Sequence, residues 1–478
     1  MPSCNTRFSS KHRFSLLISF LVIILFLSVS SNLFSQRPSY KISANLSPSG
    51  LSLTGTIDIS YTNNSSESLD KLGIHLWPNA YKERNTALVE QKLNQGDLTL
   101  YRTAKENLGG LFDLNFTSPD QSVQLTQDGG NIDISWIKLS EPLLPGATIH
   151  IKSPYTLKIP LSFSRMGRTS TSYQLSQWYP HIAVYDAEGW HMMPYLDQGE
   201  YFNDFADYEV TITMPKEYKV AATGELVSTQ ENGQITQRVY SASNVIDFAW
   251  FADREFVEST KQVDVGRDKT VDLHIFTHTN EKTWDKAMMY AERALQFYSE
   301  WLGPYPYDNM SVVYTPFSKA GYMEYPMVAE IGFTPDPEFL DRVIAHEIGH
   351  TWLYGILANN ERKNPWLDEG FNSFLENLYM EKYYDAPVEF TFPKILHGKH
   401  SMPDYDAYQH FVRATGKLQP PLTPPERQGG NQYVFSAYYL PLQGLNFMME
   451  KVGPEKMKEM LRHYYDQHKF THVSITDV

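Results

Sequence analysis

The chain is poor in cysteine and in positive charge, and each shortage narrows the classes of protein to which it can belong. Cys4 is the single cysteine in 478 residues, so no internal disulfide bond can form and the fold depends on its hydrophobic cores. Lysine and arginine together number 41 against 55 aspartates and glutamates, which leaves a formal net charge of -14. Nucleic acid is therefore not an expected partner, because binding to phosphates requires a basic surface.

A long apolar run stands near the amino terminus. Arg7, Lys11 and Arg13 precede residues 14–29, which are almost wholly apolar, and small serine residues follow. This order is typical of a secretory signal peptide, so we expect residues 1–35 to be removed and the mature protein to be periplasmic or secreted. The alternative is an uncleaved membrane anchor, although the run is short for a span. The first residue of the purified protein distinguishes the two.

Up to about residue 277 the hydrophobic pattern is that of strands. Hydrophobic residues make up 42% of the chain, and a chain of 478 residues exceeds what one core usually supports, so several domains are expected. Apolar residues occupy every second position in segments such as 208–214, which Pro215 ends. This alternation predicts strands with one buried and one exposed face, as in antiparallel sheets.

After residue 277 the period changes to that of helices. Apolar residues recur at intervals of three and four from Trp284 to Leu302, and Gly303-Pro304 ends the run. We therefore predict an α+β multidomain protein with these parts: a signal peptide (1–35), an N-terminal antiparallel β domain (36–277) and a mostly helical domain (278–478).

The residue pattern His346-Glu347-x-x-His350 predicts a metal site in the helical part. Residues four apart lie on one face of a helix, so the two imidazoles can bind a single zinc ion, with Glu347 beside them as a general base. Glu369, at the start of a second helical pattern, is the candidate third ligand. Three protein ligands leave a fourth position open, which is typical of catalytic and not of structural zinc. We expect one Zn²⁺ per chain and a hydrolytic reaction.

The alternative for this motif is a salt-bridged core helix. The motif lies among apolar residues such as Val343, Ile344 and Ile348. A charged group buried there without a partner is costly, and a metal ion accounts for a glutamate and two histidines at once. We therefore favour the zinc site.

These residues resemble the gluzincin aminopeptidases of peptidase family M1, whose pattern is His-Glu-x-x-His, eighteen further residues and Glu. Upstream, Gly321-Tyr-Met-Glu324-Tyr-Pro is similar to that family's Gly-x-Met-Glu-Asn exopeptidase motif. The resemblance is strong from about residue 271 to 453. It implies a β domain followed by a thermolysin-like catalytic domain, and hydrolysis of the amino-terminal peptide bond of peptides that have a free amino terminus.

The resemblance also implies roles in substrate binding. Glu324 would pair with the substrate's free amine, next to Gly321, Tyr322 and Met323 of the same motif. Tyr325 stands where the family usually has asparagine, which leaves the binding of the peptide backbone open at that point. In the family a glutamine or glutamate of the β domain also helps to bind the amine. The candidates for that residue are Gln174 and Gln177, between which spacing does not decide.

Two further side chains are expected to assist the chemistry. The resemblance implies that Tyr438 donates a hydrogen bond to the oxyanion. The alternative is that Tyr438 has no catalytic role and is an ordinary aromatic residue, one of the 31 tyrosines of the chain. Glu376 lies seven residues after Glu369 on the same helical face, where it can hold a ligand histidine.

Other functions stay open at this level. They are an endopeptidase, an epoxide hydrolase of the kind that some relatives combine with peptidase activity, and a non-catalytic scaffold of the same fold. The set of His346, Glu347, His350 and Glu369 argues against a scaffold, which does not need all four. The sequence does not decide the oligomeric state, the preferred amino-terminal residue, or whether the chain is a short form or a fragment.

Overall fold

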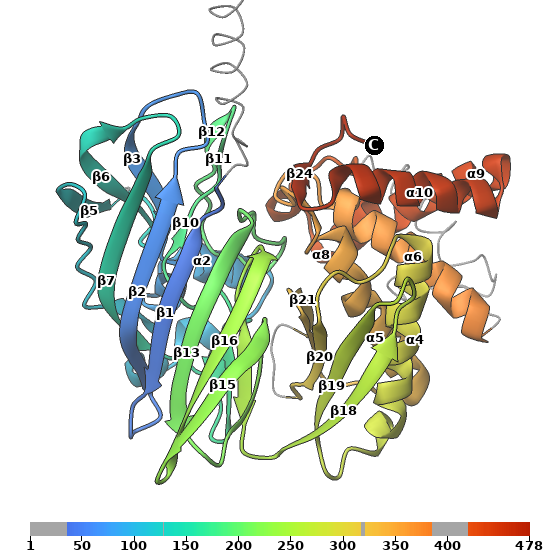
Figure 1. Ribbon diagram of the computed structural model, residues 1–478, viewed down its shortest axis with the longest axis horizontal. Helices are drawn as coiled ribbons and strands as arrows, with labels where there is room; N and C mark the ends of the chain where they lie inside the picture. The colour runs from blue at the N-terminus through green and yellow to red at the C-terminus, as the bar shows by residue number, and fades with distance from the viewer. Residues whose placement is uncertain (1–35, 128, 317–320, 385–418) are drawn as a thin grey trace, which may run out of the picture. The chain divides into compact units, whose positions relative to one another are not determined.

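The order of strands and helices follows the predicted α+β class. The computed structural model describes residues 36–127, 129–316, 321–384 and 419–478. The expected signal peptide lies outside the described residues. Strands dominate up to His278, and most of the long helices follow it (Figure 1). Among the described residues, no helix combines the length and the apolar character that a membrane span requires.

A seven-stranded sheet is the largest element of the amino-terminal part. Its order is β15 (Glu225–Asn232), β16 (Ile235–Val245), β13 (Ala206–Pro215), β1 (Ser39–Leu46), β2 (Ser52–Thr62), β7 (Thr148–Lys158) and β4 (Gly110–Phe112). The predicted strand 208–214 lies within β13, and its alternate side chains are buried as expected. One pair departs from the predicted antiparallel arrangement, because β1 and β13 run parallel.

Three smaller sheets and short helices complete this part. The first has the order β10 (His181–Ile182), β3 (Leu69–His75), β6 (Ile134–Leu143) and β5 (Val123–Gln127). The second has the order β14 (Lys219–Ala222), β17 (Trp250–Asp253), β9 (Ser172–Leu175) and β8 (Gly167–Arg168). The third is the pair β11 (Tyr185–Asp186) and β12 (Gly189–Trp190). The helices are η1 (Trp77–Tyr81), α2 (Ala87–Asn94), α3 (Thr99–Arg102) and η2 (Lys105–Asn107).

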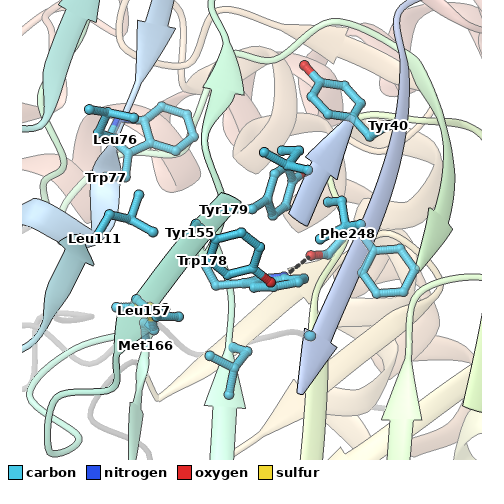
Figure 2. Packing of buried hydrophobic residues seen from close by; sticks show 14 of the residues in the cluster. Tyr40, Leu76, Trp77, Leu111, Tyr155, Leu157, Met166, Trp178, Tyr179 and Phe248 are labelled. Atoms are coloured by element: carbon cyan, nitrogen blue, oxygen red, sulfur yellow. Dashed lines mark hydrogen bonds between the residues drawn. The ribbon is translucent and has the colours of Figure 1, made fainter. Parts of the chain in front are cut away.

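An aromatic core fills the space between these sheets. Trp178 is fully buried in it, and its indole Nε1 donates a hydrogen bond to the carbonyl oxygen of Phe248 at 3.0 Å (Figure 2). A buried indole of this kind needs such a partner for its N–H group. The aromatic residues Trp178 and Tyr179, which surround the candidate glutamines in sequence, are therefore core residues.

The carboxyl-terminal part joins a five-stranded sheet to helices. The sheet order is β18 (Phe256–Asp264), β19 (Thr270–His278), β20 (Asn309–Tyr314), β22 (Val328–Ile331) and β21 (Tyr322–Tyr325). The other elements are η3 (Lys282–Lys286), α4 (Ala287–Trp301), α5 (Pro337–Leu353), β23 (Leu357–Asn359), α6 (Trp366–Tyr384), η5 (Pro425–Arg427), α8 (Gly430–Tyr433), the π-helix η6 (Val434–Tyr439), α9 (Leu440–Val452), α10 (Pro454–His468) and β24 (Thr471–Val473).

The predicted boundary at residue 277 does not coincide with a boundary in the packing. β18 and β19 precede it, yet they pair with β20 and β22 and bury Val271, Leu273 and Ile275 against the helices. The change of sheet therefore comes after β17, which ends at Asp253. Periodicity marks where strands give way to helices, whereas sheet membership depends on long-range pairing that periodicity does not encode. Residues Arg37–Val478 form one compact unit.

Close contact among α4, α5 and α6 predicts a strict requirement for glycine at position 349. A Cβ atom added to Gly349 would lie 2.1 Å from Asn372 Oδ1 and 2.4 Å from the Tyr298 hydroxyl oxygen. Gly349→Ala should therefore lower the free energy of unfolding by about 1–3 kcal/mol, the usual cost of overpacking. The measurement is urea unfolding of the metal-free protein.

The matched control is Gly444→Ala on the exposed face of α9, where an added Cβ meets nothing within 4 Å. Alanine favours helix over glycine by about 1 kcal/mol, so this variant should be as stable as wild type or more so. A Gly349→Ala protein as stable as wild type would show that the three helices are not packed as closely as described.

Candidate active site

Helix α5 carries the two histidines of the motif, and its amino-terminal end is well defined by the sequence. The Asp336 side chain accepts a hydrogen bond from the backbone N–H of Phe339 at 2.9 Å, and Pro337 occupies the first turn. These are the residues that favour a helix start. The helix then continues to Leu353, and the apolar residues around the motif are buried in the helical core.

Helix α6 is fastened to α5 next to the first histidine. Asn372 Nδ2 donates a hydrogen bond to the carbonyl oxygen of His346 at 2.8 Å, and the Tyr298 hydroxyl donates to Asn372 Oδ1 at 3.0 Å. Glu369 lies in the first turn of α6. One amide side chain thus connects α4, α5 and α6 and sets the distance between the histidines and Glu369.

His346, His350 and Glu369 form a group that can hold one metal ion. The two Nε2 atoms lie 3.0 Å apart, and Glu369 Oε2 lies 3.5 Å from that of His346 and 3.4 Å from that of His350. Ligands of a tetrahedral zinc ion at about 2.0–2.2 Å are separated from one another by about 3.3–3.6 Å. The two separations from Glu369 fall in this range, whereas the two Nε2 atoms would have to move apart by about 0.3 Å to hold such an ion.

A carboxylate behind each histidine directs Nε2 toward the shared position. His346 Nδ1 lies 3.0 Å from Glu376 Oε2, as expected from the sequence, and Arg342 pairs with the other oxygen of Glu376. His350 Nδ1 is hydrogen-bonded to Asp368. Partners of this kind fix the orientation of metal-binding imidazoles. Sequence reasoning missed Asp368; an acid directly before the candidate ligand Glu369, in the first turn of the helix, was the available signal.

The electrostatics of the group favour positive charge at its centre. Burial opposes charge on the imidazoles, yet Glu376 raises the pKa of His346 to about 10, and Glu324 together with Glu369 does the same for His350. In turn, although burial acts against it, His350 holds the pKa of Glu369 at about 2. The carboxylates around the two imidazoles thus favour positive charge at this position, which is suited to a cation.

Glu347 follows the first histidine of the triad on α5 and lines the same site. One of its carboxylate oxygens, Oε2, is buried and has no hydrogen-bond partner among the described residues. Burial raises the pKa of Glu347, while His346 and His350 lower it, and the pKa is about 7. A carboxylate with an unpartnered oxygen and a pKa near neutrality is suited to accept a proton from water.

A cavity of about 310 Å³ lies over the triad. Its walls include the triad, Glu347 and the β21 residues Tyr322, Met323 and Glu324. Gly321, expected with them, is not among the lining residues, and its carbonyl oxygen accepts a hydrogen bond from the backbone N–H of Gly332 at 2.8 Å. Burial, followed by the neighbouring charge of Glu200, raises the pKa of Glu324 well above its ordinary value. Glu324 is therefore a buried carboxyl group that a cation would stabilise.

Tyr438 also lines the cavity, in the π-helix Val434–Tyr439. Its hydroxyl group donates a hydrogen bond to Glu369, and its ring stacks on His346 with a centroid distance of 6.1 Å. Turns of π-helix are frequent at functional sites, where they redirect a side chain. Tyr438 thus reaches the triad from an element separate from both ligand helices.

The expectation for Gln174 and Gln177 is corrected by the structure, which keeps both side chains away from the cavity. Gln174 lies in β9 and accepts a hydrogen bond from Ser162 Oγ at 3.3 Å. Gln177 Nε2 donates to Asp247 Oδ2 at 2.9 Å. Both are buried within the amino-terminal part, because β9 pairs with β17 in an interior sheet.

Another segment of the amino-terminal part reaches the cavity in their place. Residues 197–200, together with Arg165 and Gln95, line it. These residues have no motif spacing, and their only signal in the sequence is a Gly between acidic residues in Asp197-Gln-Gly199-Glu200. Gly199 has a positive φ of 90°, a conformation that glycine adopts without strain.

Removal of one imidazole should abolish metal binding. The structure places His346 Nε2 at the shared position, so His346→Ala leaves two ligands and should reduce bound zinc from one equivalent to a small fraction. The measurement is metal analysis after dialysis against a limited zinc concentration. The matched control is His463→Ala, on the exposed side of α10, which should keep a full equivalent. A full equivalent in His346→Ala would exclude this triad.

Comparisons with known proteins agree with this geometry. Residues 286–478 match the peptidase family M1 domain. Leukotriene A-4 hydrolase of Xenopus laevis is 29% identical over 193 residues, which cover 38% of this chain and 30% of that protein. Leucine aminopeptidase 2 of Coccidioides immitis is 32% identical over 114 residues, which cover 23% of this chain and 18% of its own length. The chain thus spans less than a third of each of these two relatives.

Solved structures extend the likeness of the fold to nearly the whole chain. The M1 zinc metallopeptidase of Deinococcus radiodurans aligns with a TM-score of 0.64 at 18% identity and covers 92% of this chain and 89% of its own. Aminopeptidase A of Legionella pneumophila aligns with a TM-score of 0.62 at 14% identity, over 94% of this chain and 48% of its own. These structures share the succession of a β part and a helical part. The resemblance predicted from the motifs is confirmed for residues 286–478, which match the peptidase family M1 domain.

Proposed function

We propose that this protein is a zinc-dependent aminopeptidase that hydrolyses the amino-terminal peptide bond of peptides. One observation carries the proposal: a single cavity contains a three-ligand metal group, the unpartnered carboxylate oxygen of Glu347 and the buried carboxyl group of Glu324. The first two are the parts of a hydrolytic site. The third provides a reason for a free amino terminus to bind at one end of it.

Zinc is the metal that this set of ligands fits best. Two imidazoles and one carboxylate, with room for a fourth ligand, are typical of catalytic zinc. When bound, zinc would polarise the scissile carbonyl group and make a water molecule more acidic. His346, His350 and Glu369 would hold one ion per chain.

Glu347 would move the proton in this reaction. Glu347 lines the cavity and one of its carboxylate oxygens has no partner among the described residues, so it could accept a proton from the attacking water and later deliver it to the leaving amine. Because the carboxylate lies one residue after a ligand histidine on a rigid helix, its position relative to the reacting carbon is fixed in advance.

Tyr438 would stabilise the negative charge that develops on the carbonyl oxygen. Its hydroxyl group lies at the triad, where it donates a hydrogen bond to Glu369. Burial raises the pKa of Tyr438 well above its ordinary value, so the hydroxyl group keeps its proton and remains a donor. A donor held beside a developing oxyanion is typically among the strongest contributions to catalysis.

Glu324 would determine where the chain is cut. An ammonium group that pairs with its carboxylate forms a charge-assisted hydrogen bond and sets the register of the peptide. Tyr322 and Met323, adjacent on the edge strand β21, would line the peptide next to it. An endopeptidase needs no such anchor, and an epoxide hydrolase has no substrate amine to bind there.

The general base is tested by Glu347→Gln. The amide has the same shape but cannot accept the proton of water, so kcat should fall by a factor on the order of 10²–10⁴ while zinc remains bound. The measurement is turnover of an amino-acid p-nitroanilide together with zinc content. The control is Glu338→Gln, an exposed residue in the first turn of the same helix, which should keep wild-type turnover. Near-normal turnover in zinc-loaded Glu347→Gln would remove this residue from the mechanism.

The aminopeptidase assignment is tested by Glu324→Gln with one peptide whose amine is either free or acetylated. Wild type should cleave the free form far better, because only that form offers a charge to pair. The variant should lose on the order of 10²-fold in kcat/KM for the free peptide, mainly through KM, and much less for the acetylated one. If wild type cleaves both peptides equally well, the anchor does not exist and the protein is an endopeptidase.

A further inference from the structure

The amino-terminal part contributes two carboxylates to the wall of the cavity, and only one of them has its charge fully paired. Glu200 and Asp197 both line the cavity together with Glu324 and the triad. They belong to the same short segment, yet their counter-charges differ. The difference determines which cation the wall can attract.

Arg165 forms an ion pair with Glu200. Its guanidinium group bonds both carboxylate oxygens of Glu200 and also donates to the carbonyl oxygen of Asp197 at 3.0 Å. The Arg165 side chain is only 5% exposed. A bidentate pair of this kind is strong and cancels both charges. Apart from the ligand histidines, Arg165 is the only basic residue among the described residues that line the cavity, so no positive group remains for an acidic ligand.

Asp197 belongs to a cluster with an excess negative charge. Lys92 Nζ lies 2.6 Å from Asp197 Oδ2 and 3.2 Å from Asp97 Oδ2, so two carboxylates share one ammonium group. The Lys92 side chain is only 7% exposed, whereas that of Asp197 is 21% exposed. Asp197 lines the cavity, whereas Asp97 and Lys92 do not, so Asp197 is the member of this negatively charged cluster that a ligand in the cavity can reach.

The Asp197 carboxylate is held rigidly in this orientation. Ser164 Oγ donates a hydrogen bond to it, and the backbone N–H of Asp197 donates to Gln91 Oε1 at 2.7 Å. The next residue, Gln198, donates from Nε2 to the carbonyl oxygens of Pro425 and Gln428 at 2.5 and 3.0 Å. A carboxylate fixed before binding loses little freedom when a cation pairs with it.

We infer that Asp197 selects substrates whose amino-terminal residue has a cationic side chain, lysine or arginine. The inference rests on the proposed function, because it assumes that the cavity holds the first residue of a peptide. Glu324 would receive the α-ammonium group, while the side-chain cation would pair with Asp197 on the wall that the amino-terminal part supplies. An acidic first residue would meet only carboxylates that are already in excess.

The experiment compares lysyl and norleucyl p-nitroanilides, whose side chains share the same hydrocarbon stem and differ in the ammonium group. Wild type should show a kcat/KM ratio of lysine to norleucine on the order of 10 or more, as expected for a partly buried ion pair. Asp197→Asn should lower this ratio by about tenfold, and added salt should lower the wild-type ratio because salt screens such pairs. Asp97→Asn should also lower the ratio, but less than Asp197→Asn, because Lys92 then pairs with Asp197 alone. The matched control is Glu338→Gln, which removes an exposed carboxylate outside the cavity and should keep the ratio.

Each outcome separates the two claims. Hydrolysis of both substrates at similar kcat/KM by wild type overturns the selectivity and leaves the aminopeptidase intact. An unchanged ratio in Asp197→Asn also overturns the role of Asp197. An equal fall of the ratio in Glu338→Gln and Asp197→Asn assigns the effect to general charge and overturns it as well. If zinc-loaded wild type hydrolyses neither substrate, the proposed function fails, and this inference fails with it.

Discussion

An excess of buried carboxylates around two imidazoles is the constraint on which the rest of this structure depends. Glu324, Glu347 and Glu369 are each less than one-tenth exposed and line one cavity. Negative charge buried without a partner is costly, so such a cluster is stable only if cations or protons accompany it. Arg342 at Glu376 and Arg165 at Glu200 meet part of this need within the protein. The remaining negative charge lies at the triad and at Glu324, which are the places where a metal ion and an ammonium group would bind.

The same constraint explains why the cavity is built from both parts of the chain. Arg362 Nε donates to the carbonyl oxygen of Glu200 at 3.1 Å, and the Tyr354 hydroxyl donates to that of Tyr201 at 2.9 Å. These donors come from the helical part, and the segment they hold comes from the amino-terminal part. The wall that carries Asp197 and Glu200 is therefore in place only when both parts are folded together, in agreement with the single compact unit Arg37–Val478.

The features that the sequence could predict depend on residues that lie close together in the chain. The spacing of His346 and His350 defines one face of one helix, and alternation in 208–214 defines one strand, so both could be read without knowledge of the fold. Glu376 was also accessible, because it lies on the same helical face as Glu369. The role of Asp368 depends on how α6 crosses α5, which no periodicity encodes.

What the sequence could not predict depends on contacts between distant segments. Gln174 and Gln177 were wrong candidates because strand pairing, and not proximity to aromatic residues, decides which loop reaches the cavity. Sheet membership is a second example, since β18 and β19 join strands that follow them in the chain. Asp197 and Lys92 lie far apart in sequence, and nothing in either neighbourhood indicates that they pair.

The excess negative charge on the cavity wall would also allow the substrate specificity to change while the proposed catalytic residues stay the same. The triad and Glu347 lie on α5 and α6, which are fastened to each other by Asn372. The carboxylates of the outer wall lie on a segment of the amino-terminal part, where one is cancelled by Arg165 and the other is only half compensated by Lys92. A change in the partner of Asp197 or Glu200 would alter the charge offered to the side chain of a substrate without moving a metal ligand. Under the proposed function, specificity and catalysis would thus be carried by separate elements that meet at one cavity.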